Sequence, residues 1–415
     1  MSDPAGKMVS VGAPQIFQGA FDFQLVRAMG TQTYGGAELG ECFSTARKIT
    51  NNDTESWYTE WNAIGERVRR LGDGYLSKND KVSAREAYQR ANSYYRSAEF
   101  FLQHEDPRHR ETWQNARTSF QKATQLFDPP IETIEIPYED ITLPAYFVSG
   151  GDGNEPRPTL LLMGGFDSSV EEIYYFGAAA GARRGYNVLI FEGPGQRTTA
   201  HMHPGSIYRH DYEVPAATIV DYAISRADVD SENIAFAGFS LGGNLGARVG
   251  LYEKRIKACI VNSLLTDLRG AFLGLLGMDI KDDPISQEDI DAATNDITAP
   301  VFAWIAREAD WRFNCGNLPD FFEALRAYDL TDQIQNMSIP FLSIASIGEG
   351  PHIVDYTKNI IDMDNPYLNG IILDGENDGA DAHCHINNLS RMHADMFSWL
   401  DGALGIDRVN DNRFN

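Results

Sequence analysis

The stretch NIAFAGFSLGGNLGARVGL, residues 233–251, combines an apolar run, a serine between glycines and a helix-forming segment. Gly238 and Gly242 flank Ser240 in a G-x-S-x-G pattern, and glycine permits a sharp strand-to-helix turn that a Cβ atom would obstruct. Such a turn exposes the serine hydroxyl at a helix N-terminus, where the backbone N–H of Leu241 can meet a developing oxyanion. We therefore predict that Ser240 is a nucleophile. The alternative is a tight turn that holds a small residue and has no catalytic role.

Short apolar runs on both sides of this stretch predict a sheet. Two adjacent runs, residues 131–136 and 141–148, predict paired strands. Helical stretches separate the further runs, which is typical of parallel strands joined by crossover helices. These runs are residues 159–163, 187–191, 233–237, 258–261, 340–344 and 368–373. We predict a doubly wound, mostly parallel α/β sheet domain over residues 129–415.

Two other parts of the chain have helical patterns. Between residues 54 and 126, apolar residues recur at three- and four-residue steps until Asp128-Pro129-Pro130 ends the pattern, and no 34-residue repeat is present. We predict a helical N-terminal domain, residues 1–128. Residues 265–337 are helical and aromatic and too long for a loop, so we predict an inserted lid. Its aromatic residues are predicted to line a substrate pocket, although such residues are more often simply core; they are Trp304, Trp311 and Phe313.

A second oxyanion donor is expected in the loop that follows the run 159–163. Gly164 and Gly165 stand there and leave the backbone free to turn inward. The backbone N–H of Phe166 is therefore the candidate donor. The alternative is a glycine-rich loop that does not contact substrate.

The general base is expected after the last strand, where the sequence reads Asp381-Ala382-His383-Cys384-His385. Both histidines are candidates, and we favour His383. Metal binding by Asp378, His383 and His385 would need further convergent ligands and would leave Ser240 without a role. We therefore predict no metal and no other cofactor.

The third member of a catalytic triad is expected after the run 340–344. Glu349 occupies that loop, and Asp355 is the fallback. A carboxylate in this place would fix the imidazole tautomer and stabilise the imidazolium formed during acylation. Either residue could equally be a solvated loop charge.

Composition limits the partners of the chain. Its 415 residues carry 35 Lys and Arg against 59 Asp and Glu, a formal net charge of −24. This balance argues against nucleic acid or an anionic membrane surface, both of which require clustered cations. Four separated cysteines without a CxxC pair, no signal-peptide pattern and no apolar run of membrane-spanning length predict a cytoplasmic protein.

With these residues in place, the chain resembles a branch of the α/β-hydrolases that carries a helical N-terminal domain. That branch includes 2,6-dihydroxypseudooxynicotine hydrolase, which cleaves a C–C bond, and fungal pigment enzymes that shorten polyketide chains. The resemblance covers most of residues 55–403. The matching stretches are GGFDSSVEE (164–172), RGYNVLIFEGPGQ (184–196), VDSENIAFAGFSLGG (229–243), EKRIKA (253–258) and ADAHCHINNL (380–389).

The resemblance implies an α/β-hydrolase fold, a Ser-His-acid triad with His383 as base, and homodimerisation. It also implies a substrate-binding glutamate in the loop Asp167–Glu172; Glu172 is the match and Glu171 its neighbour. Asp167 of the same loop is also predicted to bind substrate. The sequence departs from the branch at Gly348-Glu349-Gly350-Pro351, where G-x-x-D is common, and after Gln196. The first departure bears on the identity of the acid, and the second points to a changed pocket.

Together these features predict a serine hydrolase that attacks an activated carbonyl of a polyketide- or aryl-ketone-like small molecule. The favoured reaction is C–C bond hydrolysis of a β-diketone through a seryl acyl-enzyme. Esterase, lactonase or thioesterase activity and acyl transfer are alternatives, because they share the first half-reaction. A further alternative is a catalytically inactive hydrolase fold that serves as a binding protein.

Overall fold

The computed structural model describes residues 16–411, apart from residue 18 and residues 153–154, 279–283 and 295–298. An eight-stranded sheet runs through it in the order β1-β2-β4-β3-β5-β6-β7-β8. β1 pairs with β2 and β2 with β4 in antiparallel fashion, and every other pairing is parallel. The strands are β1 (Glu132–Tyr138), β2 (Ile141–Val148), β3 (Arg157–Met163), β4 (Asn187–Phe191), β5 (Val229–Phe239), β6 (Ala258–Asn262), β7 (Phe341–Ser346) and β8 (Leu368–Leu373). The predicted mostly parallel α/β sheet is confirmed.

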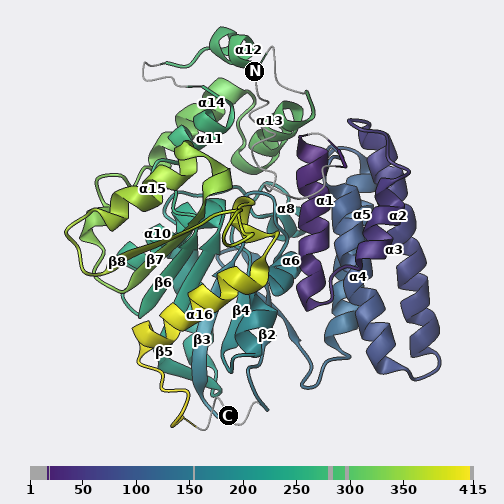
Figure 1. Cartoon of the computed structure of the whole chain (residues 1–415), viewed down its shortest axis with the longest axis horizontal. Helices are drawn as coiled ribbons and strands as arrows, with labels where there is room; N and C mark the ends of the chain where they lie inside the picture. Colours follow the sequence, from purple (N-terminus) through teal and green to yellow (C-terminus); the bar gives the residue numbers. More distant parts are fainter. Residues whose placement is uncertain (1–15, 18, 153–154, 279–283, 295–298, 412–415) are drawn as a thin grey trace.

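Helices cover both faces of the sheet, because alternate residues of each buried strand point to opposite sides. In β3, Leu161 belongs to the core under α9, α10 and α15, whereas Leu160 and Leu162 pack in the core under α7 and α16. α16 crosses one face diagonally (Figure 1). These helices are α6 (Val170–Ile173), α7 (Ala179–Ala182), α8 (Arg197–Met202), α9 (Glu213–Ser225), α10 (Leu241–Tyr252), α15 (Pro351–Ile361) and α16 (Leu389–Leu404).

A layer of helices stands beside the sheet (right side of Figure 1). It consists of α1 (Ala20–Gly30), α2 (Leu39–Ala46), α3 (Thr54–Leu76), α4 (Lys81–Glu99) and α5 (Pro107–Thr124). The side chains of Asp53, Asp80 and Asp106 cap the N-termini of α3, α4 and α5 by accepting backbone N–H groups. The predicted domain boundary at residue 128 falls between α5 and β1, and the division into two domains stays a proposal. Residues 1–15 lie outside the described part.

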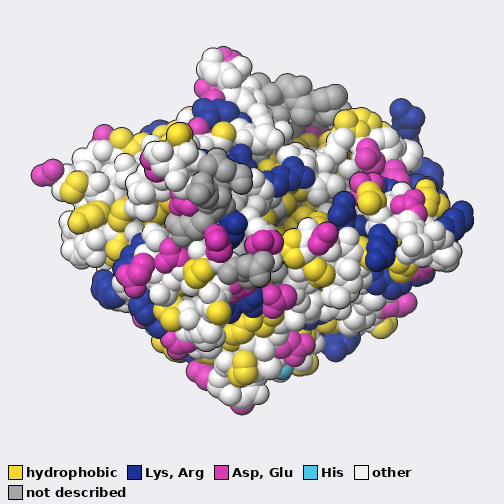
Figure 2. Space-filling view, turned by 90° about the horizontal axis from the view of Figure 1, so that it is seen from below, with side chains coloured by type: hydrophobic (Ala, Val, Ile, Leu, Met, Phe, Trp, Pro, Cys, Tyr) yellow, Lys and Arg dark blue, Asp and Glu magenta, His cyan; other side chains and the backbone are white. Residues whose placement is uncertain are grey.

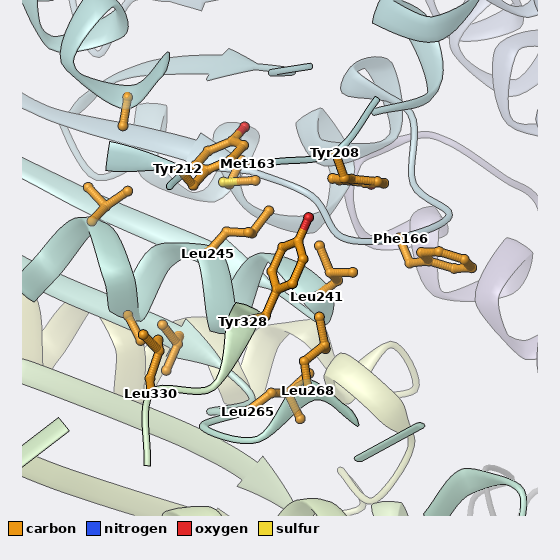
Figure 3. Packing of buried hydrophobic residues seen from close by; sticks show 14 of the residues in the cluster. Met163, Phe166, Tyr208, Tyr212, Leu241, Leu245, Leu265, Leu268, Tyr328 and Leu330 are labelled. Carbon is orange, nitrogen blue, oxygen red and sulfur yellow. The ribbon is translucent and has the colours of Figure 1, made fainter. Parts of the chain in front are cut away.

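The chain between β6 and β7 forms further helices at one end of the sheet (Figure 1, top). They are α11 (Leu268–Leu275), α12 (Gln287–Thr294), α13 (Ala299–Phe313) and α14 (Leu318–Ala324). The predicted helical insertion, residues 265–337, is thus helical where it is described; residues 279–283 and 295–298 are not. Leu265 and Leu268 pack towards Leu241 of α10 (Figure 3), so the start of the insertion lies against the elbow segment.

Charged side chains of both signs are interspersed on the face shown in Figure 2. Among the described residues, none of the helices combines the length and the apolar character needed to cross a membrane. The four cysteines are unpaired and buried.

Candidate active site

Ser240 stands between the end of β5 and the start of α10, in a backbone conformation that L-residues rarely adopt. Its φ and ψ angles are 60° and −124°. The flanking glycines are required here, because a Cβ atom on Gly238 would lie 1.9 Å from the carbonyl oxygen of Gly242. A Cβ atom on Gly242 would in turn lie 2.6 Å from the carbonyl oxygen of Gly164. Close backbone contact on both sides therefore fixes the turn that presents the Ser240 hydroxyl.

Three side chains from separate parts of the chain form one hydrogen-bonded series. Nε2 of His383 lies 2.9 Å from Oγ of Ser240, and Nδ1 of His383 lies 2.6 Å from Oε1 of Glu349. His383 follows β8 in a short 3₁₀ turn (His383–His385), and Glu349 follows β7 in another (Ile347–Glu349). The carboxyl ends of parallel strands thus bring the three groups to the same edge of the sheet. This is the geometry in which an imidazole can take a proton from a hydroxyl while a carboxylate holds its tautomer.

The carboxylate of Glu349 is buried, at 3% exposure, and is held on both oxygens. Its Oε2 accepts hydrogen bonds from Oγ of Ser263 at 2.7 Å and from the backbone N–H of Ser346 at 2.9 Å. Burial alone would raise the pKa of Glu349, but the hydrogen bonds from His383 and Ser263 outweigh it and lower that pKa. For His383, burial acts in the opposite direction and lowers the pKa. Cys384 and Glu349 beside the ring outweigh burial, so the pKa of His383 lies above its usual value.

The alternative base and acid lie elsewhere. Asp355 is half-exposed on α15 and pairs with Lys358 at 2.8 Å. His385 is fully buried, and burial lowers its pKa. Asp378, a metal ligand in the alternative considered above, accepts a hydrogen bond from Arg391 at 3.1 Å. Of the two candidate bases and the two candidate acids, the structure brings His383 and Glu349 together with Ser240.

The series Ser240–His383–Glu349 opens into a small, mainly apolar cavity of about 90 Å³. Its lining comes from the elbow, from the segments that follow β3, β6, β7 and β8, from α11 and from the start of α15. The lining residues are Phe166, Ser240, Leu241, Leu265, Ala271, Phe272, Leu275, Glu349, His352, Ile353 and His383. Ser263 and His352 were not expected from the sequence. The position of Ser263, directly after a buried strand, is the signal that could have identified it.

The loop after β3 passes directly over the elbow. A Cβ atom on Gly165 would lie 2.6 Å from Cβ of Ser240 and 2.8 Å from the backbone nitrogen of Leu241. This contact brings the two predicted oxyanion donors, Leu241 and Phe166, to the rim of one cavity. Their role as donors stays a prediction.

The predicted substrate-binding carboxylates are engaged with arginines. Both oxygens of Glu172 accept hydrogen bonds from Arg27, at 2.9 Å and 2.6 Å, and Glu172 also lies 3.2 Å from Nε of Arg96. Asp167 pairs with Arg27 at 2.5 Å. Burial disfavours ionisation of Asp167, yet Arg27 and Arg96 keep its pKa below the usual value. These ion pairs tie α1 and α4 to the loop after β3.

The three predicted pocket aromatics occupy different surroundings. Trp304 stacks on Phe100 at 5.3 Å and meets the ring of Phe166 edge-on at 5.4 Å. Phe313 packs between Tyr208 and Phe321, at ring distances of 4.8 Å and 5.1 Å. These two residues therefore form the layer behind Phe166. Trp311 instead stacks on His104 at 5.5 Å and packs against His109 and His201.

The group Glu99, His109 and His201 has ligand atoms close enough together to hold a metal ion. Oε1 of Glu99 already accepts a hydrogen bond from Nε of Arg197 at 3.0 Å, and Nη2 of Arg197 lies 2.9 Å away. A fully buried guanidinium so close to the group would repel a cation. The cluster fits an ion pair between α4 and α8 better than a metal site.

Comparisons with known proteins agree with this architecture. The FrsA-like esterase family matches residues 49–270. The 20-hydroxy-prefusarin hydrolase FUS2 of Gibberella moniliformis is 30% identical over 424 residues, which cover 94% of this chain and 97% of the relative. Hydrolase acrC of Aspergillus aculeatus is 36% identical over 268 residues, and the match spans 60% of this chain and 62% of the length of acrC.

The crystal structure of 2,6-dihydroxy-pseudo-oxynicotine hydrolase has the same fold, with a TM-score of 0.67 at 21% identity. The superposition covers 91% of this chain and 95% of that one. The resemblance inferred from the sequence motifs is thus confirmed. The family match covers more than half of the chain and includes the elbow, and a relative with 30% identity is aligned over nearly its full length. The chain is a hydrolase of the α/β-hydrolase kind and belongs to the FrsA-like esterase family.

Proposed function

We propose that the chain is a serine hydrolase that attacks an activated carbonyl, with Ser240 as nucleophile, His383 as base and Glu349 as the orienting acid. The observation that carries this proposal is the hydrogen-bonded series from Ser240 through His383 to Glu349, which opens into a mainly apolar cavity. An apolar cavity favours this chemistry, because hydrogen bonds to a developing oxyanion are stronger where water is excluded.

In the proposed reaction, Oγ of Ser240 bonds to the carbonyl carbon while its proton passes to Nε2 of His383. The backbone N–H groups of Leu241 and Phe166 stabilise the oxyanion. Collapse of the tetrahedral intermediate breaks the bond to the leaving group, which takes the proton from His383. Water then attacks the acyl-enzyme with His383 as base, and the products are a carboxylic acid and the protonated leaving group.

The favoured substrate is a polyketide- or aryl-ketone-like secondary metabolite with a β-diketone unit. The relative FUS2 is named for a small organic substrate, 20-hydroxy-prefusarin, which supports a small molecule rather than a macromolecule. C–C cleavage leaves a carbanion, so the electron pair must spread onto the second carbonyl oxygen as an enolate. The carbon then takes its proton from His383.

His352 is the group that we propose for this second oxygen. Among the described lining residues, its imidazole is the polar side chain outside the Ser-His-Glu series. Gly274 of α11 leaves room for it, because a Cβ atom there would lie 2.3 Å from Cβ of His352. A hydrogen bond from the imidazole would stabilise the enolate. Glu172, which the resemblance implies for substrate binding, keeps that role only as a prediction.

The cavity volume of about 90 Å³ is below the roughly 300–1,000 Å³ of typical small-molecule sites. Only the acyl part of a polyketide-like substrate would fit. We propose that α11 moves outward to admit the remainder, since Ala271, Phe272 and Leu275 of this helix line the cavity.

Ester hydrolysis is the second candidate, because the matching family is one of esterases. Labelling with a fluorophosphonate tests the serine mechanism that both candidates share, with Ser240→Ala as the control. Mass spectrometry of products from 1-phenyl-1,3-butanedione and phenyl acetate then separates C–C from ester cleavage. His352→Leu is expected to reduce diketone cleavage at least tenfold more than ester cleavage, because only the diketone forms an enolate and one lost donor costs about 10²–10³ in kcat. Absence of labelling in the folded protein would leave the inactive-fold alternative. Equal losses on both substrates would remove His352 from the proposal.

Homodimerisation and cytoplasmic location stay predictions.

A further inference from the structure

Side chains from outside the loop hold four consecutive backbone carbonyls in the loop after β3. These carbonyls belong to residues 164–167, directly over the elbow. The donors are Gln196 Nε2 for Gly164 (3.1 Å), Tyr208 Oη for Gly165 (3.0 Å), Arg312 Nη1 for Phe166, and Arg96 Nη2 (3.0 Å) and Arg197 Nη1 (3.3 Å) for Asp167. The donors come from α4, α8, α13 and the segments beside α8, so residues distant in the sequence converge on this loop.

The hydrogen bond to Gly165 bears directly on the proposed oxyanion donor. The carbonyl of Gly165 and the N–H of Phe166 belong to one peptide group, and in a planar trans peptide these two bonds point in opposite directions. A donor that holds the carbonyl on one side therefore turns the Phe166 N–H to the other. The preceding N–H, that of Gly165, is occupied by Oγ of Ser168 at 2.8 Å. Of these two N–H groups, that of Phe166 is therefore the candidate donor for the cavity.

The direction of the Tyr208 hydrogen bond is fixed by its neighbours. Nη1 of Arg312 lies 3.4 Å from Oη of Tyr208, and a guanidinium can only donate. The hydroxyl therefore accepts from Arg312 and donates its proton to the Gly165 carbonyl. The backbone of Tyr208 is also tied to α13, since its N–H donates to the carbonyl of Arg312 at 2.8 Å. The rings of Tyr208 and Phe166 stack with centroids 6.4 Å apart, and both are visible beside α10 in Figure 3.

We infer that Tyr208 is a positioning residue for the oxyanion hole: its hydroxyl holds the Gly165–Phe166 peptide group so that the Phe166 N–H faces the oxyanion. This inference rests on the proposed serine mechanism and adds a residue to it. Tyr208 acts through the peptide group and does not touch the reacting atoms. Arg312 supports it by donating to both the Phe166 carbonyl and the Tyr208 hydroxyl.

Tyr208→Phe tests the inference, because it removes the hydroxyl and keeps the ring. Loss of an oxyanion donor costs about 10²–10³ in kcat, and a donor that is only loosened should cost about 10-fold. We expect kcat for 4-nitrophenyl acetate to fall about 10-fold with KM within about twofold. Inhibition by phenylboronic acid, which forms a tetrahedral adduct with serine, should weaken by the same factor. The pH dependence of kcat/KM should not move, because His383 and Glu349 are untouched.

Tyr186→Phe is the matched control. Tyr186 is also fully buried, and its hydroxyl donates to Asp401 at 2.6 Å, away from the cavity. Its loss should leave kcat and boronate affinity unchanged. Tyr208→Met, which fills the space without a hydroxyl, provides a second variant should the phenylalanine protein fail to fold, and the same parallel loss is expected. Wild-type kcat and boronate affinity in a folded Tyr208 variant would overturn the inference while leaving the hydrolase intact. Failure of the wild-type protein to react with a fluorophosphonate would instead overturn the serine mechanism itself.

Discussion

Replacing Glu349 by glutamine is expected to place the His383 proton on the wrong nitrogen. At present Oε1 of Glu349 faces Nδ1 of His383, while Oε2 accepts from Ser263 Oγ and the Ser346 N–H. Glutamine has one oxygen and one NH₂ group. It can therefore accept hydrogen bonds either from His383 or from Ser263 and Ser346, but not from both sides as the carboxylate does. If the amide oxygen takes the Oε2 position, the NH₂ group faces Nδ1. The imidazole must then accept there and carry its proton on Nε2, towards Ser240, where it cannot act as base.

The energetic balance between the two amide orientations favours the inactive one. In the opposite orientation, the NH₂ group faces the Ser346 N–H, which is a fixed donor and loses its acceptor. The Ser263 hydroxyl can rotate to accept, so one buried N–H remains unpaired, at a cost of about 1–3 kcal/mol. At 1.4 kcal/mol per factor of ten, the inactive orientation is preferred about 5- to 150-fold. With the carboxylate charge also lost, kcat should fall about 10⁴-fold, the size of the effect known for a wrong triad tautomer.

The assay is kcat for 4-nitrophenyl acetate, with Asp355→Asn as the matched control. Asp355 pairs with Lys358 on an exposed helix face, so its loss should change kcat less than about twofold. The pH profile gives a second measurement. Glu349 helps to raise the pKa of His383. The acidic limb of the pH profile of Glu349→Gln should therefore lie at lower pH than that of the wild type. A folded Glu349→Gln protein with more than a tenth of wild-type kcat, or an inactive Asp355→Asn protein, would refute the reasoning.

Two further predictions concern buried groups near the site. Burial and Glu171 raise the pKa of Glu192 from 4.5 to about 7, so this carboxyl ionises more readily in the unfolded chain and lowers the free energy of unfolding as the pH rises from about 4.5 to about 7. Glu192→Gln should therefore increase the free energy of unfolding by about 3 kcal/mol at pH 9 and by little at pH 4, as urea melts would show; equal shifts at both pH values would contradict this. Gly165→Ala should abolish fluorophosphonate labelling, because its Cβ would lie 2.6 Å from Cβ of Ser240, whereas Gly402→Ala, with open space around it, should label normally.

The sheet and the elbow could be predicted because their signals are local. Each buried strand is a short apolar run between helical segments, and two glycines around Ser240 permit only a sharp turn. The candidate base and acid could be chosen from chain order, since residues after parallel strands meet at one edge of the sheet. The structure brings His383 and Glu349 to Ser240 at hydrogen-bonding distance, as that order suggested.

The contacts of the loop after β3 could not be read in this way. Arg27 and Glu172 are 145 positions apart, and Arg312 and Phe166 are 146 apart. Nothing in the local sequence of a helix shows which of its arginines will be buried against a distant carbonyl. The same limit applies to Trp311, whose helical spacing gives no sign that it packs on His104 rather than beside the cavity.

The hydrogen bonds to the loop after β3 can be explained by the two glycines at its start. Gly164 and Gly165 allow the loop to pass within van der Waals distance of Ser240, but glycine loses more conformational freedom on folding than any other residue. Within the loop, the Ser168 hydroxyl holds the Gly165 N–H. Hydrogen bonds from α4, α8 and α13 to the loop carbonyls add rigidity from outside. The helical layer and the inserted helices therefore contribute to the geometry of the proposed oxyanion site. Because Arg312 of α13 donates to the carbonyl of Phe166, a shift of α13 would change the position of this carbonyl.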